Sequence, residues 1–280
     1  MKTGLVMEGG ALRGLFTCGI NDVLMENGIS FDGAVGVSAG ATFGCNIKSR
    51  QIGRAYRYNA KYNGDKRYKS ISSWIKTGNL FNEDFCYNEL PYKLDIWDDK
   101  TFAENPMEFY VVATDMETGK AVYHKCTDGL NEDIRWIQAS ASMPLASKPV
   151  EIGGRRYLDG GTADSIPLRF MQDKGFDHVL VIETQPYDYV KNKQQYMKLI
   201  RLVYRKYPDF IKAIENRYIM YNEEKAYIKE QEKSGNVLVV RPDEPLNISP
   251  LTKDPDEIKR VYENGRRAGE KLLSKESWLR

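Results

Sequence analysis

The first part of the chain alternates short apolar segments with helix-like segments, and glycines stand at the junctions between them. Residues 3–7 (TGLVM) form an apolar run that ends at EGG, which predicts a buried strand followed by a turn. Residues 15–27 carry apolar side chains at helical spacing, and Gly28 predicts the end of that helix. Residues 31–37 predict a second strand, and residues 39–49 a helix of small residues. This order favours a parallel sheet covered by helices.

The rest of the chain continues the α/β pattern. Further strands are predicted at residues 107–116, 120–126, 177–184 and 236–242, with two short strands around a Gly-Gly turn in 150–161. Helices are predicted at residues 132–143, where Pro144 ends the helix, and at 166–175, 191–235 and 254–273. With 41% hydrophobic residues, the chain can bury a substantial core. We expect one α/β domain over residues 1–280, with a helical elaboration at about 191–235 in its C-terminal third.

Composition narrows the classes of partner and cofactor. The 41 Lys and Arg residues nearly balance the 39 Asp and Glu residues, which predicts neither nucleic-acid binding nor an acidic partner. The four cysteines form no CxxC pair, which favours a reducing compartment and argues against a zinc site. No leader-like segment begins the chain, and no apolar run approaches the roughly 20 residues that cross a bilayer. We expect a cytoplasmic protein without metal or cofactor, and its oligomeric state stays open.

A glycine-rich loop, EGGALRG, follows the first predicted strand. It lacks the Lys-Ser/Thr of a phosphate-binding P-loop, and Ala11 interrupts the G-x-G-x-x-G of a dinucleotide-binding turn. Backbone N–H groups at a helix start can instead hold a developing negative oxygen, as in an oxyanion hole. The plainer alternative is a tight turn into a helix. The candidate oxyanion residues are Gly9, Gly10, Ala11, Leu12, Arg13 and Gly14.

The segment GVSAG places Ser38 between two glycines, directly after a predicted strand and before a small-residue helix. That context is typical of a nucleophile elbow, in which a strained turn exposes a serine hydroxyl. The flanking residues of this elbow are Gly36, Val37, Ala39 and Gly40. An ordinary Gly-Ser turn is the alternative, and the combination of strand, glycines and helix argues against it.

The residue that would take the serine's proton is less obvious. The chain contains two histidines, His124 and His178, and both fall on predicted strands, where a structural role is favoured. Asp159 ends another predicted strand and is followed by Gly160 and Gly161. A carboxylate at a strand terminus can act as a general base when burial raises its pKa. Taken alone, however, this Asp-Gly pair favours a plain turn.

A resemblance decides between these alternatives. The motifs LVMEGGALRG, FDGAVGVSAGA, ASASMP and YLDGGTADSIP, in this order, resemble the patatin-like phospholipase family, with its bacterial single-domain members most similar. The resemblance covers residues 1–168, which contain all the candidate catalytic motifs. It implies a three-layer α/β/α sandwich with a mostly parallel central sheet. It also implies a Ser–Asp dyad without histidine, in which Ser38 is the nucleophile and Asp159 the base.

The resemblance further implies that loop 9–14 forms the oxyanion hole and that the substrate is a lipid or other acyl ester. Ala11 departs from the family's usual third glycine, and alanine is tolerable there unless the backbone requires a positive φ. The expected activity is a serine acyl hydrolase with an acyl-enzyme intermediate. Acyl transfer to another acceptor, and a non-catalytic regulatory or binding protein of the same fold, are the alternatives.

Several secondary features have competing interpretations. Arg13 could face a substrate phosphate, but hydrogen bonds that brace the loop are favoured, and a turn role is favoured for Asp115. The basic segments 48–69 and 191–206 could lie transiently against anionic lipid at a membrane periphery, although solvated helix faces are the plainer interpretation. Residues that select the substrate are expected in segments 59–98 and 191–235.

Overall fold

The computed structural model describes residues 2–235 and 237–275, and its core is an eight-stranded mixed sheet. The strand order is β5-β6-β3-β2-β1-β7-β8, with β4 paired to β3 outside this path. The strands are β1 (Thr3–Met7), β2 (Gly33–Val37), β3 (Glu108–Asp115), β4 (Ala121–Cys126), β5 (Val150–Ile152), β6 (Arg155–Asp159), β7 (His178–Ile182) and β8 (Val237–Val240). The central run β3-β2-β1-β7-β8 is parallel, as predicted. The predicted strand at 236–242 begins at Asn236, which lies outside the described residues.

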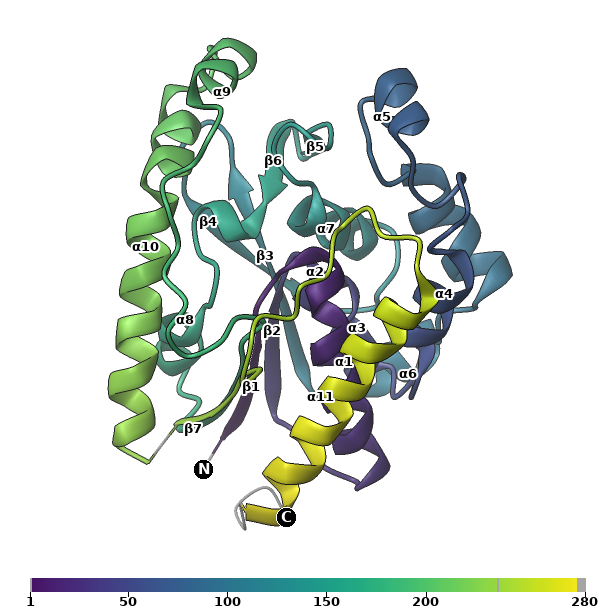
Figure 1. Ribbon diagram of the computed structural model, residues 1–280, viewed down its shortest axis with the longest axis vertical. Helices are drawn as coiled ribbons and strands as arrows, with labels where there is room; N and C mark the ends of the chain where they lie inside the picture. The colour runs from purple at the N-terminus through teal and green to yellow at the C-terminus, as the bar shows by residue number, and fades with distance from the viewer. Residues whose placement is uncertain (1, 236, 276–280) are drawn as a thin grey trace.

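Helices cover both faces of this sheet, which confirms the three-layer α/β/α prediction (Figure 1). Leu5, Ala34 and Leu180 point into the core on one face, whereas Val6 and Val35 point to the other, as the two-residue period of strands requires. The first face is covered by α1 (Gly14–Glu26), α7 (Glu132–Ala141) and α11 (Pro255–Lys275), and the second by α8 (Leu168–Asp173) and α10 (Pro208–Lys233).

Shorter helices complete the molecule. They are α2 (Ala39–Thr42), α3 (Cys45–Lys48), α4 (Arg54–Tyr62), α5 (Ile71–Thr77), α6 (Asp99–Glu104) and α9 (Met197–Val203). A π-helical stretch at Phe85–Leu94 precedes α6. The sequence pattern predicts no element at residues 70–104, although the structure contains three there. Among the described residues, no helix has both the length and the apolar composition needed to cross a membrane.

The predicted continuous helix at 39–49 is wrong at its centre, where the structure has two short helices, α2 and α3. The N–H groups of Asn46 and Ile47 donate to Phe43 and Gly44, three residues back, whereas that of Gly44 donates four residues back. Such a change of pattern tightens and interrupts an α-helix. The consequence for the site is that only the single turn of α2 directly follows Ser38.

An unusual pairing at β3 brings distant parts of the chain together. Along one edge of β3, β4 pairs with residues 109–114. Since a strand has only two edges, β2 and β6 must share the other edge. There Val37 lies opposite Val112, and Asp159 lies opposite the next residue, Ala113. The carboxyl ends of β2 and β6 therefore meet at one point.

Candidate active site

Ser38 occupies the turn between β2 and α2 in a strained backbone conformation, with φ 55° and ψ −118°. Such positive φ values are costly for a residue with a side chain and are found mostly at functional sites. The flanking glycines make the turn feasible. A Cβ at Gly36 would lie 2.2 Å from the Gly40 oxygen, and one at Gly40 would lie 2.2 Å from the Met7 oxygen. The glycine spacing around Ser38 is thus required by close backbone packing.

Asp159 is buried at the end of β6, and it lines the same hollow as Ser38. The Gly161 N–H donates a hydrogen bond to its carboxylate at 2.8 Å. Close packing holds the chain here, since a Cβ on Gly160 would lie 2.1 Å from the Val112 oxygen. The structure thus brings together, in one hollow, the two residues predicted to form the dyad.

The environment of Asp159 favours a carboxyl group that can accept a proton. Burial raises its pKa above the ordinary value of an aspartate. The positive charge of Arg217, the Ser38 hydroxyl, the Gly161 N–H and the charge of Lys191 each act in the opposite direction, and burial outweighs them. A raised pKa makes the carboxylate a better base than an exposed aspartate.

Loop 9–14 lies directly against Ser38. A Cβ on Gly9 would lie 2.8 Å from the Ser38 Cβ, and Gly10 has φ 154°. Ala11 adopts φ 49°, so the residue at the position of the family's third glycine does have a positive φ, and alanine is strained there. Within the described residues, the backbone N–H groups of Gly9 and Gly10 have no hydrogen-bond acceptor. They are therefore available to an oxygen atom held beside Ser38.

Hydrogen bonds with residues outside loop 9–14 fix this loop and the turn at Ser38. Glu8 is buried and accepts hydrogen bonds from the Thr184 N–H at 2.5 Å and the Tyr221 hydroxyl at 2.8 Å. The Thr184 hydroxyl also donates to the Gly9 carbonyl at 2.8 Å. At the other side, the Ser38 N–H donates to the Ser140 hydroxyl at 2.9 Å. Sequence reasoning missed these supporting roles, because α7, α10 and the segment after β7 supply them through tertiary contacts.

Two hollows meet at Ser38, and both are lined by Ala11, Ser38 and Met143. The first is largely apolar, and its other lining residues include Phe43, Tyr58, Phe81, Tyr87, Leu90 and Ile137. The second is more polar, and its other lining residues include Arg13, Asp159, Lys191, Ile214, Arg217 and Tyr221. Segments 59–98 and 191–235 therefore supply walls on the two sides of Ser38, as the sequence predicts.

The two histidines line neither hollow. His124 Nε2 lies 2.6 Å from Asp133 Oδ1, and its ring stacks on Trp136. His178 begins β7, at the opposite end of the sheet from Ser38. His124, Asp133 and Cys126 place one ligand atom each within 4.8 Å of one another, but the Asp133 carboxylate already accepts two backbone N–H groups. This cluster joins β4 to α7 and lines neither hollow.

The structure gives different outcomes for the sequence predictions about Asp115 and Arg13. Asp115 accepts the N–H groups of Glu117 and Thr118 and pairs with Arg155, which confirms its turn role. The bracing role of Arg13 is wrong. Its guanidinium forms no hydrogen bond or ion pair within the described residues, and its Nε is buried without a partner. The residue lines the second hollow, and its Nη2 lies 3.0 Å from where a Cβ on Gly10 would stand, so it packs against its own loop without a hydrogen bond to it.

Comparison with known proteins adds independent findings. A family model described as patatin-like phospholipase matches residues 5–171, and a model for a domain of unknown function matches residues 207–278. The Escherichia coli protein YjjU, described as uncharacterized, is 25% identical over 98% of this chain and 77% of its own length. The lysophospholipase nte1 of Emericella nidulans is 28% identical over 66% of this chain, which covers only 12% of the fungal protein. The crystal structure of VipD from Legionella pneumophila aligns with a TM-score of 0.48 and 13% identity over 98% of this chain and 67% of VipD.

Proposed function

The chain belongs to the patatin-like phospholipase family, and on that premise we propose that it is a serine acyl hydrolase that cleaves carboxylic ester bonds of lipids. Relatives named as lysophospholipases support a lipid ester as the substrate. The observation that carries the proposal is the position of the strained Ser38 beside the buried Asp159, in one hollow where β2 and β6 meet. The apolar hollow beside Ser38 has the character required to hold an acyl chain.

In the proposed mechanism, Asp159 accepts the hydroxyl proton while Ser38 Oγ attacks the ester carbonyl carbon. The N–H groups of Gly9 and Gly10 hold the resulting oxyanion. The C–O bond to the alcohol breaks, and the alcohol leaves with the proton held by Asp159. The acyl group is then bound to Ser38. A water molecule gives a proton to Asp159 and attacks this ester, which releases the fatty acid and restores the Ser38 hydroxyl.

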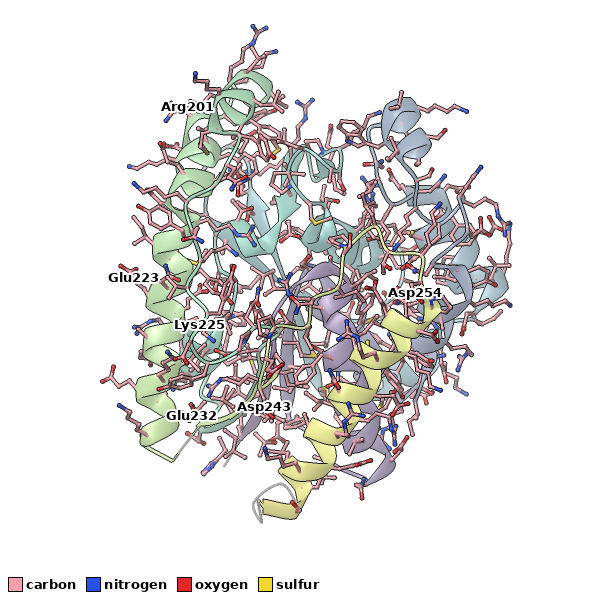
Figure 2. All side chains as sticks on the ribbon, in the orientation of Figure 1. Arg201, Glu223, Lys225, Glu232, Asp243 and Asp254 are labelled. Atoms are coloured by element: carbon pink, nitrogen blue, oxygen red, sulfur yellow. The ribbon has the colours of Figure 1, made fainter. Side chains whose placement is uncertain are left out.

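We also propose that the enzyme reaches its substrate at a lipid surface. Helices α5 and α9 stand on either side of one end of the molecule (Figure 1), and their exposed residues include Ile71, Ile75, Leu202 and Val203. Both helices are tied to one residue beside the site: the Trp74 indole donates to the Leu145 carbonyl, and the Leu145 N–H donates to the Tyr204 hydroxyl that follows α9. Arg201 extends from α9 at the same end (Figure 2), where it pairs with Glu215, and the exposed Lys198 of this helix adds positive charge. Apolar tips beside basic residues are typical of interfacial helices.

Vesicle binding tests this surface. We expect wild type to sediment with anionic phospholipid vesicles, and the double variant Ile75→Ser/Leu202→Ser to lose most of that binding. Equal sedimentation of wild type and variant, or no binding at all, would argue that α5 and α9 face solvent only.

Labelling with a fluorophosphonate, together with fatty-acid release from lysophospholipids and simple acyl esters, tests the hydrolase proposal. Wild type and Ser234→Ala, a change at the end of α10, should label and release fatty acid, whereas Ser38→Ala should do neither. Labelling without fatty-acid release, accompanied by ester formation on an added alcohol, would favour the acyltransferase alternative. Absence of both labelling and release from wild type would favour a non-catalytic protein of this fold.

A further inference from the structure

Helix α10 presents one face to the loops that carry the candidate catalytic groups. Arg217, Tyr221 and Glu224 are spaced four and three residues apart, so they lie on the same side of this helix. The helix runs along the sheet (Figure 1) and lies at the start of residues 207–278, which match a domain of unknown function. It lies beyond residues 5–171, which match the phospholipase family. The contacts of this face are therefore an addition made by the C-terminal part of the chain.

Arg217 is connected to the proposed base through Gly161. Its Nε donates to the Gly161 carbonyl, and the Gly161 N–H donates to Asp159 Oδ1 at 2.8 Å. A Cβ on Gly161 would lie 3.0 Å from Arg217 Nη2 and 3.1 Å from Asp159 Oδ1, so both side chains pack against this glycine. Two hydrogen bonds in series therefore link α10 to the Asp159 carboxylate.

Glu224 reaches the same glycine by a second route. Its Oε1 accepts the Ser165 N–H at 3.2 Å, and its Oε2 accepts the Ile166 N–H at 3.1 Å. The Ser165 hydroxyl in turn donates to the Gly161 carbonyl at 2.7 Å. One carboxyl group thus holds two consecutive N–H groups of the loop, and Ser165 passes that hold to Gly161. The routes from Arg217 and Glu224 converge on one carbonyl oxygen.

Glu224 has no direct access to a substrate at Ser38, since it lines neither of the two hollows. Burial and the neighbouring charge of Asp164 raise the pKa of Glu224 well above its ordinary value, so a carboxyl group is costly at this position. An apolar side chain would avoid that cost, but it would leave the N–H groups of Ser165 and Ile166 without their acceptor. The contribution of Glu224 is therefore the position of the loop.

The same face of α10 also contacts the other side of the Ser38 turn. Tyr221 donates its hydroxyl to Glu8 at 2.8 Å, and Glu8 directly precedes loop 9–14. One turn beyond Glu224, the fully buried Ile228 belongs to the core that joins α10 to the sheet. A helix fixed on the sheet in this way can set the positions of both loops relative to Ser38.

We propose that Arg217 and Glu224 are positioning residues of the reaction, which hold Gly161 and, through it, the Asp159 carboxylate in its place beside Ser38. This role rests on the proposed hydrolase function. The first helix of the domain of unknown function thereby contributes to catalysis. A displacement of about 1 Å in a reacting group can cost about 10²-fold in rate, so loss of this hold should lower kcat and leave KM nearly unchanged.

The kinetics of a soluble short-chain acyl ester test the role of Glu224. Glu224→Leu removes both acceptor oxygens, and we expect kcat to fall by about 10²-fold while KM changes by less than about twofold. Glu224→Gln keeps one acceptor oxygen and should have a kcat between those of wild type and Glu224→Leu. Glu223→Leu, the same change at the exposed neighbour labelled in Figure 2, should keep both constants. A wild-type kcat in Glu224→Leu, or a loss that appears only in KM, would overturn the proposal.

A second control separates positioning from general support of the fold. Ile228→Val shortens a fully buried side chain of the same helix, which belongs to the core and has no hydrogen bond with the loops. It should lower the urea midpoint and keep the kcat of wild type. A loss of kcat in Ile228→Val as large as that in Glu224→Leu would mean that α10 acts only through stability, and would also overturn the positioning role.

Hydrogen exchange measures the hold on the loop without turnover. The N–H groups of Gly161, Ser165 and Ile166 are the donors involved, so residues 159–166 should exchange faster in Glu224→Leu than in wild type and Glu223→Leu. If wild type hydrolyses no ester but this difference is found, the hydrolase proposal fails and the hold of α10 on the loop stands. Unchanged exchange in Glu224→Leu would overturn the positioning role, whether or not wild type is active.

Discussion

Ser38 directly follows β2 and Asp159 ends β6, and these two strands meet end to end along one edge of β3. Because Val37 and Asp159 lie opposite consecutive residues of β3, the pairing of the sheet itself fixes the distance between the two groups. A side chain on a rigid strand end is positioned more accurately than one on a free loop.

The acid limb of the pH–rate profile should report Asp159. Its pKa is raised mainly by burial, so the base is protonated at low pH, and kcat/KM should increase as pH rises through that raised value, above the ordinary aspartate value of about 3.9. Arg217→Gln removes the largest opposing charge and should move the limb to higher pH. Arg205→Gln, an exposed charge near α9, is the control and should leave it in place. A limb at the same pH in Arg217→Gln and wild type would contradict this assignment.

The hydroxyl of Ser140 should be needed to hold the turn at Ser38. It is fully buried and accepts the Ser38 N–H at 2.9 Å. Ser140→Ala leaves that N–H without an acceptor, at a cost of about 1–3 kcal/mol of unfolding free energy, and should lower kcat. Ser142→Ala removes only a hydrogen bond to the Gln138 carbonyl and should cost less. Urea unfolding measures the unfolding free energy, and ester hydrolysis measures kcat. Equal losses of both quantities in Ser140→Ala and Ser142→Ala would contradict a specific role of Ser140 in holding the turn.

Ala11 should be a position where glycine stabilises the protein. At φ 49°, its side chain costs about 1–2 kcal/mol, whereas glycine costs about 0.4–1 kcal/mol of unfolded-state entropy. Ala11→Gly should therefore raise the unfolding free energy by up to about 1 kcal/mol. Ala60→Gly, the same change inside α4, should lower it by about 1 kcal/mol. A lower urea midpoint for Ala11→Gly would show that the loop does not need a positive φ there.

A buried ion network should hold α10 against the sheet. Lys225 Nζ and Arg241 Nε each lie 2.8 Å from Glu183 Oε2, and Arg241 also pairs with Glu232 of α10, which is labelled with Lys225 in Figure 2. Lys225→Met leaves the fully buried Glu183 with fewer partners. In a urea titration, this change should lower the unfolding free energy by up to about 3–5 kcal/mol.

The exposed pair between Arg201 and Glu215 is the control for this network, since its two atoms lie 2.7 Å apart at the surface. Arg201→Met should cost less than about 1 kcal/mol in the same urea titration. Similar losses of unfolding free energy in Arg201→Met and Lys225→Met would mean that burial does not strengthen the network.

Much of the fold could be predicted because buried parallel strands appear as apolar runs. Residues 3–7 are such a run, and the glycines after them mark the turns. The tight approach of Gly40 to Met7 likewise left a visible signal in the GVSAG spacing. By contrast, α5 and the π-helical stretch before α6 lack a clear period, and the pattern did not predict them.

The site was predictable only in part, because local backbone geometry leaves a signal in the sequence, whereas tertiary packing does not. Ser38 and Asp159 lie in glycine-rich turns that backbone geometry demands, so they stand out in the sequence. Ser140, Lys191 and Arg217 act through side chains on helices and loops that tertiary packing brings to the site. No local pattern distinguishes Lys191 and Arg217 from ordinary surface or helix residues, and the ASASMP motif that contains Ser140 does not by itself indicate its hydrogen bond with Ser38. The positive φ of Ala11 depends in the same way on the loop's contact with Ser38 and was not visible from its residue type.

The most direct test of the proposed dyad is the rate of ester hydrolysis by Asp159→Asn, with its fold verified by circular dichroism. Asparagine can still accept the Ser38 hydrogen bond but cannot take the proton, so we expect turnover to fall by about 10²–10⁴-fold. Asp115→Asn, a change at another buried aspartate, should retain turnover, since Asp115 serves a turn. An Asp159→Asn protein that keeps more than about a tenth of wild-type turnover, well above the loss expected of a general base, would contradict the dyad.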